Sequence, residues 1–511
     1  MSKNVKSHGY AIIFTWLVKH ANLKNYGIYS DNRVGNSSRT IAFGKLRDKC
    51  TMKYIPTIGL EIHVELKTRT KMFCDSLNDP DEKHPNVNVC PICMGHPGTL
   101  PVINEEAVRK LMTVGLALNC SIAKDTFFER KNYFYPDLPK GYQISQYQKP
   151  FCYEGYMEVN GKKIRIERVH LEEDAGRLYH LPDKDYTLVD FNRAGLPLME
   201  LVTKPDLETA PDVYKFATEL RLLLRYLGAS DADMEKGQMR VEVNISLRPE
   251  GTDTLGTKVE VKNINSITAA SKAVEYEVER QTELLKKGEK IVQETRGWDD
   301  IKQRTVSQRT KEGSADYRYF PEPDLPPMQF TETHIDTIRA GLPELPAQRR
   351  TRFAKEYGLP EHDIEVFTTQ KLLGDYFEKV ASELIAFDKL SHLQRPGAEH
   401  QGKLLKLASN YAITELSRML ADIGAEPSDT KIKPENFADL VVRIFHGEIS
   451  SSGAQVVLKE MFATGKTPEN IIKEKDLAQV SNITELNKIV EDVIMEINRR
   501  LRIIKKAKLL P

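Results

Sequence analysis

The sequence predicts an α+β protein, with an antiparallel-sheet body followed by all-helical middle and tail domains. From residue 54 to about 328, apolar and polar residues alternate in short runs, which is typical of half-buried strands. Beyond about residue 330, apolar residues recur at helical spacing, as they do over 372–380. A chain of 511 residues is also too long for a single core. We therefore expect four segments, at 1–52, 53–328, 329–395 and 396–511.

Charge and composition exclude several classes of protein. The chain has 74 Lys and Arg against 73 Asp and Glu, so any binding to nucleic acid must depend on local patches. It contains no run of 18 apolar residues, and we expect no membrane-spanning segment. Six cysteines in a chain of this length do not make a disulfide framework. That cysteine usage indicates a reducing compartment.

The first 50 residues differ in composition from the rest of the chain. They hold nine Lys and Arg but two Asp and Glu, with Ser and Asn throughout and no secretory cleavage pattern. Residues 10–18 could form a short amphipathic helix flanked by lysines. This composition fits a mitochondrial transit peptide over 1–52 better than a signal peptide. The alternative is a disordered basic tail.

The first strand of the predicted body is GLEIHVEL, at residues 59–66. Its apolar residues at 62, 64 and 66 face a core, while Glu61, His63 and Glu65 share the other face at a spacing of about 7 Å. Carboxylates beside an imidazole suit a divalent cation such as Mg²⁺. The alternative is an ordinary exposed strand face.

A second strand ends in HLEEDAG at 170–176, where three carboxylates are adjacent. Apolar and polar residues alternate up to Ile166, but the alternation slips by one residue at Glu167–Arg168. A β-bulge would absorb this slip and re-aim the later side chains. We therefore expect a bulged strand that delivers His170 and the acids to one place. Either water or a bound cation would offset the repulsion among the carboxylates.

Two further strands have mixed charges on one face. RVEVNISLR at 240–248 places Arg240 and Glu242 together, and TKVEVKN at 257–263 places Lys258, Glu260 and Lys262 together. A face with both signs of charge suits a phosphate group bound with a metal ion. We therefore expect one face of the predicted sheet to carry the binding and catalytic residues.

Two loops add cations and aromatic rings. The segment RKNYFYPDLPKGYQISQY, at 130–147, could stack a nucleotide base or an RNA end, or could be a rigid packed loop. DFNRAGLPLMEL, at 190–201, places Arg193 before an apolar run. The chain has no Walker-type glycine-rich loop, GxGxxG, GxSxG or kinase motif. Any ATP site must therefore be of another kind.

Three cysteines suggest a metal site. Cys74 precedes CPIC at 90–93, and Cys-x2-Cys with one upstream thiol is typical of structural zinc sites. A closed zinc site needs four ligands, and the candidates for the fourth are His84 and Ser76. Serine is a poor zinc ligand. Cys74, Cys90 and Cys93 thus predict a zinc site only if His84 completes it.

Ten motifs, in chain order, resemble those of one protein family. The chain resembles the B subunit of the glutamyl-tRNA(Gln) amidotransferase, closely over about 55–330 and more loosely beyond. The basic leader makes it similar to the mitochondrial form. The motifs are GLEIHVEL, CPICMGHPGTLPVIN, GLALNC, RKNYFYPDLPKGYQISQY, HLEEDAG, DFNRAGLPLMEL, VEVNISLRP, TKVEVKNINS, QETRGWD and DYRYFPEPDLPP.

The resemblance implies a function. In this family, an amidase-type glutaminase subunit supplies ammonia, and some complexes contain a further small subunit. The B subunit binds mischarged Glu-tRNA(Gln), uses ATP and Mg²⁺ to phosphorylate the glutamyl γ-carboxylate, and amidates it. The resemblance implies that this chain is a carbon–nitrogen ligase of the mitochondrial matrix that makes Gln-tRNA(Gln).

The resemblance also assigns roles to residues. The predicted catalytic set is Glu61, His63, Glu172, Glu173 and Arg193, and the first four of these would also hold Mg²⁺. The predicted cofactor-binding set is Lys131, Arg240, Lys258 and Lys262.

The chain departs from the family pattern in two places. Zinc-binding members have Cys-x-Cys where this chain has Cys74-Asp75-Ser76, which weakens the zinc prediction. The family tail continues with further helices, so we expect a shortened tRNA-binding tail here. Its six Lys and Arg at 499–508 would contact phosphates or end a solvated helix.

Two other functions stay open on sequence grounds. One is a stand-alone ATP-dependent carboxylate–amine ligase, and the other is a noncatalytic RNA-binding assembly factor. The chain has no amidase Ser-Ser-Lys pattern and no Cys-His-Glu arrangement, so it has no glutaminase signature of its own. Dependence on tRNA and on a partner protein would separate these functions.

Overall fold

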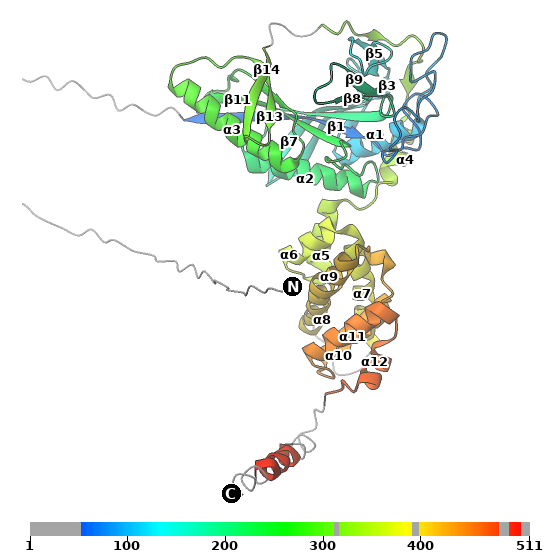
Figure 1. Ribbon diagram of the computed structural model, residues 1–511, viewed down its shortest axis with the longest axis vertical. Helices are drawn as coiled ribbons and strands as arrows, with labels where there is room; N and C mark the ends of the chain where they lie inside the picture. Colours follow the sequence, from blue (N-terminus) through cyan, green and yellow to red (C-terminus); the bar gives the residue numbers. More distant parts are fainter. Residues whose placement is uncertain (1–52, 311–315, 391–397, 480–489, 502–511) are drawn as a thin grey trace, which may run out of the picture. The chain divides into compact units, whose positions relative to one another are not determined.

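The computed structural model describes residues 53–310, 316–390, 398–479 and 490–501. The predicted transit peptide, and most of the basic cluster at 499–508, lie outside these ranges. Within them, a sheet-containing body is followed by helices, which confirms the predicted α+β class (Figure 1).

A nine-stranded sheet forms the body, in the order β14-β13-β12-β11-β1-β10-β7-β6-β2. Four long strands form its centre and pair antiparallel: β11 (Met239–Pro249), β1 (Tyr54–Glu65), β10 (Pro197–Thr203) and β7 (Lys162–Glu173). The outer strands are β2 (Ser121–Ile122), β6 (Cys152–Val159), β12 (Val259–Lys262), β13 (Glu294–Asp299) and β14 (Arg304–Thr310).

One strand pair corrects the prediction of an antiparallel sheet. β12 and β13 pair in parallel, so the sheet is mixed. The helix α3 (Ile267–Lys286) connects these two strands, and a crossover of this kind returns the chain in the same direction. All other pairs in this sheet are antiparallel.

Three smaller sheets accompany the large one. Each contains short strands that bring distant segments of the chain together. They consist of β15 (Phe320–Pro321), β4 (Glu129–Asn132) and β5 (Tyr142–Ser145); of β16 (Met328–Gln329) and β3 (Asp125–Thr126); and of β8 (Arg177–His180) and β9 (Thr187–Asp190).

Side-chain alternation in β1 separates a core from a polar face, as predicted. The apolar residues at 58, 60, 62 and 64 are fully or almost fully buried. Each such side chain stabilises the fold by about 1.5–3 kcal/mol. The helix α2 (Ala210–Tyr226) packs against α3, and both run along the sheet (Figure 1). These helices begin where the side chains of Thr209 and Ser266 accept a hydrogen bond from the first turn.

The helices α1 and α4 add to the core of the body. α1 (Glu105–Ala117) begins at Asn104, whose side chain caps it, and packs against α4 (Glu332–Ala340). Ile335 of α4 belongs to the same core as the sheet. The core of the body therefore extends beyond residue 328.

The remaining helices share a second core, which runs from Phe353 to Ile472. The helix predicted around 372–380 is present, although Leu372 is 46% exposed. None of the helices in the described ranges combines the length and apolar character needed to cross a membrane. They are α5 (Pro346–Tyr357), α6 (Glu361–Thr369), α7 (Lys371–Leu390), α8 (Ala398–Tyr411), α9 (Ser417–Ile423), α10 (Pro434–Phe445), α11 (Ser451–Thr464) and α12 (Pro468–Lys475).

Candidate functional site

A row of polar residues crosses the four central strands of the sheet. His170 on β7 lies opposite Glu200 on β10, Glu200 lies opposite His63 on β1, and His63 lies opposite Arg240 on β11. Residues directly opposite in neighbouring strands point to the same face. The strand register therefore brings together four residues that are far apart in the sequence.

The β-bulge predicted at Glu167–Arg168 is confirmed, and it sets this register. Arg168 pairs with Val202, whereas Ile166 pairs with Thr203, which leaves Glu167 as the extra residue of β7. Without this extra residue, every later side chain of β7 would point to the opposite face. The bulge thus aims His170 and Glu172 at the row.

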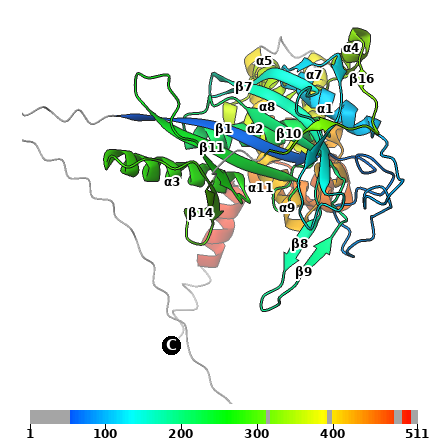
Figure 2. The same ribbon diagram turned by 90° about the horizontal axis from the view of Figure 1, so that it is seen from above.

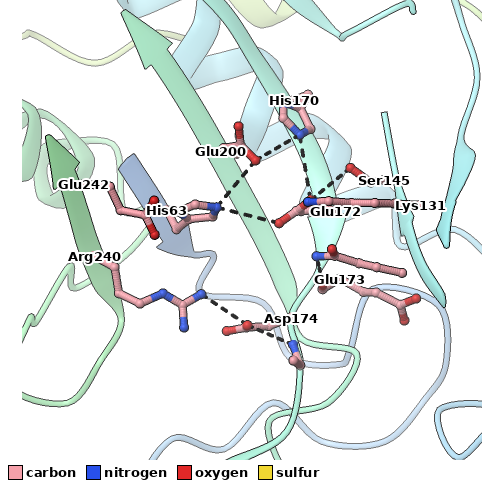
Figure 3. A network of polar contacts seen from close by, with 12 residues as sticks. His63, Lys131, Ser145, His170, Glu172, Glu173, Asp174, Glu200, Arg240 and Glu242 are labelled. Atoms are coloured by element: carbon pink, nitrogen blue, oxygen red, sulfur yellow. Dashed lines mark hydrogen bonds and ion pairs between the residues drawn. The ribbon is translucent and has the colours of Figure 1, made fainter. Parts of the chain in front are cut away.

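Two carboxylates face two imidazoles at the centre of the row (Figure 3). Glu200 Oε2 lies 3.4 Å from His63 Nε2 and 3.5 Å from His170 Nε2. Glu172 lies 3.9 Å from each of the same two ring nitrogens. Three sets of potential metal ligands overlap here, each with its atoms within 4.8 Å of one another: Glu61, His63 and Glu200; His170, Glu172 and Glu200; Glu61, Glu242 and Glu260.

The electrostatics of these side chains suit a divalent cation. Burial raises the pKa of Glu61, and the charges of Glu200 and Glu242 raise it further. Burial alone would raise the pKa of Glu200, but His170 and His63 outweigh it and hold that pKa below its usual value. Carboxylate oxygens are the hard ligands that Mg²⁺ prefers, and imidazoles beside them can act as further ligands or as hydrogen-bond donors to them. The residues present therefore fit this ion.

Cations and aromatic rings complete a cleft of about 970 Å³ over the carboxylates. Lys131 Nζ lies 3.9 Å from Glu172, and Lys262 Nζ lies 2.7 Å from Glu242. Burial would lower the pKa of Lys131, but Glu172 outweighs it and raises that pKa, so the lysine stays charged. Arg240 and Lys258 also line the cleft.

The aromatic loop predicted to stack a base lines the same cleft. Tyr147 and Tyr319 stack with their ring centroids 4.7 Å apart. Tyr133 and Tyr317 form a second, edge-to-face pair at 5.9 Å, and Lys131 Nζ lies 5.3 Å from the Tyr317 ring. All four rings line the cleft. The cleft thus brings acids, cations and aromatic rings together.

Comparison with known proteins identifies two family domains in the chain. The GatB/GatE catalytic domain matches residues 56–336, and a GatB domain matches residues 398–509. The chain is 47% identical over 449 residues to the B subunit of the aspartyl/glutamyl-tRNA(Asn/Gln) amidotransferase of Thermoanaerobacter pseudethanolicus, a match that covers 87% of this chain and 90% of the relative. The same protein of Persephonella marina is 48% identical over 447 residues, with the same coverage. The chain belongs to the GatB/GatE family.

Two of the catalytic residues expected in this GatB/GatE chain lie apart from the carboxylate sets. Glu173 follows Glu172 in β7 and so points to the other face, where its carboxylate lies 2.5 Å from Lys140 Nζ and accepts a hydrogen bond from the Ile144 backbone at 2.8 Å. Arg193 Nε lies 3.2 Å from Asp174 Oδ2, beside the cleft. The other predicted cleft residues line it together: Glu61, His63, Lys131, Glu172, Arg240, Lys258 and Lys262.

Sequence reasoning did not assign a role to Glu200, which contacts both histidines. A signal was present, because Glu200 is the single charged residue of PLMELVT, the whole of strand β10. An isolated carboxylate in a buried apolar strand is costly unless it has partners. His170 was expected near the acids but was not placed in the catalytic set, and the structure puts it in the row.

The three cysteines come together as expected, but His84 does not join them. The Sγ atoms of Cys74, Cys90 and Cys93 lie within 4.8 Å of one another. His84 bonds Glu82 instead, at 2.9 Å, and its side chain is 85% exposed. His84 therefore does not supply the fourth ligand that a closed zinc site would need.

A buried lysine stands beside the cysteines. Lys71 is 0% exposed, and its Nζ lies 3.8 Å from Cys93 Sγ and 3.2 Å from the Phe191 carbonyl oxygen. A hydrogen bond from Cys74 and the charge of Lys71 lower the pKa of Cys93 to about 4. Burial lowers the pKa of Lys71 below its usual value, and in its charged form this lysine favours the Cys93 thiolate, which is part of what a zinc ion would do. Ser76 Oγ lies 4.0 Å from the same sulfur.

Proposed function

We propose that the chain catalyses the ATP- and Mg²⁺-dependent amidation of Glu-tRNA(Gln) within the amidotransferase complex. Family membership makes it a component of a tRNA amidotransferase, and the relatives are named for aspartyl/glutamyl-tRNA(Asn/Gln). The observation that carries the finer proposal is the cleft, where acids, imidazoles and cations face one another. The γ-carboxylate attacks the terminal phosphorus of ATP and releases ADP, and ammonia then displaces phosphate to leave the amide.

The side chains have distinct tasks in this reaction. Glu61, His63, Glu172 and Glu200 would hold Mg²⁺, which supplies charge neutralisation for the transferring phosphoryl group. Glu242 and Glu260 form a further acidic set beside Glu61. The cations around the cleft, which are Lys131, Arg240, Lys258 and Lys262, would bind phosphate oxygens and orient them for in-line attack. The loss of any one cation should weaken nucleotide binding.

The tyrosines give the cleft a surface for flat rings. The stacked pair of Tyr147 and Tyr319 presents an aromatic face of the kind that binds adenine or the terminal base of a tRNA. Such stacking tolerates any base and does not contact the amino acid, so it does not distinguish a glutamyl from an aspartyl group. The relatives' names include both aspartyl and glutamyl substrates, so both charged tRNAs belong in an assay.

Partners and location are part of the proposal. Because the relatives are named as amidotransferase subunits and this sequence has no glutaminase motif of its own, we infer that an amidase-type glutaminase subunit supplies the ammonia. The basic composition of residues 1–52, which precede the family match at 56, supports a transit peptide and a place in the mitochondrial matrix. Deleting residues 2–52 should leave the purified enzyme active but mislocalise it in cells. Loss of activity in vitro would contradict the assignment of this segment.

The direct test is conversion of Glu-tRNA(Gln) to Gln-tRNA(Gln) by the purified complex with ATP, Mg²⁺ and ammonium chloride. We expect formation of Gln-tRNA(Gln) to require both ATP and Mg²⁺. One ADP should be released for each Gln-tRNA(Gln) formed. Amidation of free glutamate at the same rate would instead identify a stand-alone ligase. Full activity of a variant that lacks both Glu172 and Glu200 carboxylates would indicate a noncatalytic role for this chain.

A further inference from the structure

A segment of a smaller sheet contacts the end of β7 that carries the acids. The strands β7, β10, β1 and β11 lie side by side in the large sheet (Figure 2), whereas β5 belongs to a three-stranded sheet, where it pairs with β4. Side chains of residues 143–146 nevertheless contact β7. The Gln143 amide donates to the Glu173 carbonyl oxygen at 2.6 Å, and the Gln146 side-chain oxygen accepts from the Leu171 backbone at 3.2 Å. The segment therefore fixes this end of β7.

A third contact of this segment ends on the candidate metal site. Ser145 Oγ donates a hydrogen bond of 2.9 Å to Glu172 Oε2, and both residues are almost fully buried (Figure 3). Lys131 Nζ and His170 Nε2 each lie 3.9 Å from the same oxygen. The other oxygen, Oε1, lies 3.9 Å from His63 Nε2. Glu172 therefore has one oxygen held by Ser145 and the other turned toward His63.

The two oxygens of Glu200 are divided in a similar way. Its Oε1 lies 3.7 Å from a guanidinium nitrogen of Arg168. Its Oε2 lies 3.4 Å from His63 Nε2 and 3.5 Å from His170 Nε2. Each carboxylate therefore presents one oxygen to His63, while its other oxygen faces a donor of the protein.

The number of oxygens that a carboxylate presents affects which cation it binds best. Ca²⁺ takes roughly six to eight oxygen ligands in flexible geometry and often takes both oxygens of one carboxylate. Mg²⁺ is smaller, demands octahedral geometry and keeps several water molecules, so one oxygen from each carboxylate suits it. Hydrogen bonds to a ligating carboxylate fix its orientation, and their loss commonly weakens metal binding by about 10–100-fold. A donor on one oxygen of Glu172 should therefore favour Mg²⁺.

We propose that Ser145 is a positioning residue that makes the site select Mg²⁺ over Ca²⁺, because its hydroxyl holds Glu172 with Oε1 turned toward the ion. This inference rests on the proposed function, in which Glu172 helps to hold Mg²⁺. Ser145 is 1% exposed, so it acts through the carboxylate of Glu172 and does not touch ATP or tRNA. A hydrogen bond with a purely structural role would change the stability of the fold and leave the selectivity between the cations unchanged.

The test is calorimetric titration of the purified complex with Mg²⁺ alone and with Ca²⁺ alone, in the absence of ATP and tRNA. The relevant site is the one whose binding Glu172→Gln weakens, and we expect the wild type to bind Mg²⁺ there more tightly than Ca²⁺. Ser145→Ala should raise the Kd for Mg²⁺ about tenfold. The Kd for Ca²⁺ should change less than about threefold, because the released carboxylate can offer this ion both oxygens. Ser145→Thr keeps the hydroxyl and should retain the wild-type ratio of the two Kd values.

Thr305→Val provides a matched control. Thr305 Oγ1 donates a hydrogen bond of 2.5 Å to the buried carboxylate of Glu277, which is not one of the residues that line the cleft. The substitution removes the same kind of hydrogen bond from another part of the body. It should lower the unfolding temperature and change neither Kd more than about twofold.

The two cations separate the outcomes. If the wild-type complex binds no Mg²⁺, the metal site of the proposed function fails, whatever Ser145 does. If the wild type prefers Ca²⁺, or if Ser145→Ala leaves both Kd values unchanged or raises both equally, the role of Ser145 in selectivity is overturned. If Ser145→Ala does not fold, Ser145→Cys, which has a weaker donor of similar size, must lose the preference for Mg²⁺ for the proposal to stand.

Discussion

Substitution of two adjacent glutamates should affect the Mg²⁺ dependence of the reaction differently, because they point to opposite faces of β7. Glu172 lies 3.9 Å from Lys131 Nζ and 3.9 Å from each imidazole of the row. Two unit charges about 4 Å apart interact by roughly 4 kcal/mol at an effective dielectric constant near 20. Glu172→Gln removes one such interaction with a cation held in the cleft. We therefore expect a loss of about 3–4 kcal/mol in transition-state stabilisation, or roughly 10²–10³-fold in rate.

Glu173→Gln provides the matched control. Its carboxylate pairs with Lys140, and both side chains are largely buried. Breaking a buried pair leaves an uncompensated charge, which costs about 3–5 kcal/mol of folding free energy. The Mg²⁺ requirement should not change, since Glu173 belongs to none of the ligand sets found among the described residues.

The assay is ammonium-dependent formation of Gln-tRNA(Gln) as a function of Mg²⁺ concentration, together with thermal unfolding of each variant. We expect Glu172→Gln to raise the Mg²⁺ concentration at half-maximal rate and also to lower the unfolding temperature, because Glu172 is as buried as Glu173 and pairs with Lys131. Glu173→Gln should lower the unfolding temperature but leave the Mg²⁺ dependence unchanged. Equal effects of the two substitutions on Mg²⁺ dependence would refute the assignment of these side chains to opposite faces.

Three other predictions follow, two from the structure and one from the sequence. Burial would raise the pKa of Glu277, but hydrogen bonds from Arg280 and Thr305 outweigh it and lower that pKa. Its stabilisation is therefore present above the unfolded pKa near 4.5 and is lost as the pH falls through the folded value. Glu277→Gln should accordingly destabilise the protein by about 3–5 kcal/mol at pH 7 and by less below pH 4, as measured by denaturant unfolding. Metal analysis should find less than one zinc per chain, because no fourth strong ligand joins the three cysteines among the residues that the structure describes; one zinc per chain that disappears with Cys90→Ser would contradict this. Replacing the six Lys and Arg at 499–508 with Gln should raise the Kd for tRNA and flatten its salt dependence, whereas an unchanged slope would leave them as a solvated helix end.

The sequence by itself determined the local geometry of the candidate site. Alternation in β1 placed Glu61 and His63 on a polar face, and the phase slip at Glu167 predicted the bulge that aims β7. Both features are local, because the period of two fixes which side chains share a face of one strand. The motifs in chain order predicted the family, which the comparisons show.

The tertiary structure decided which strands are neighbours. Glu200 joins the histidines because β10 pairs with both β1 and β7, and no local pattern specifies those partners. The parallel pairing of β12 with β13 follows from the crossover through α3. In both cases the deciding contact joins residues distant in sequence, and their meeting depends on packing of the whole body. His84 is a local exception, because it bonds Glu82, two residues away, instead of the cysteines. Periodicity therefore predicts the face on which a side chain lies, while register and packing decide what it meets there.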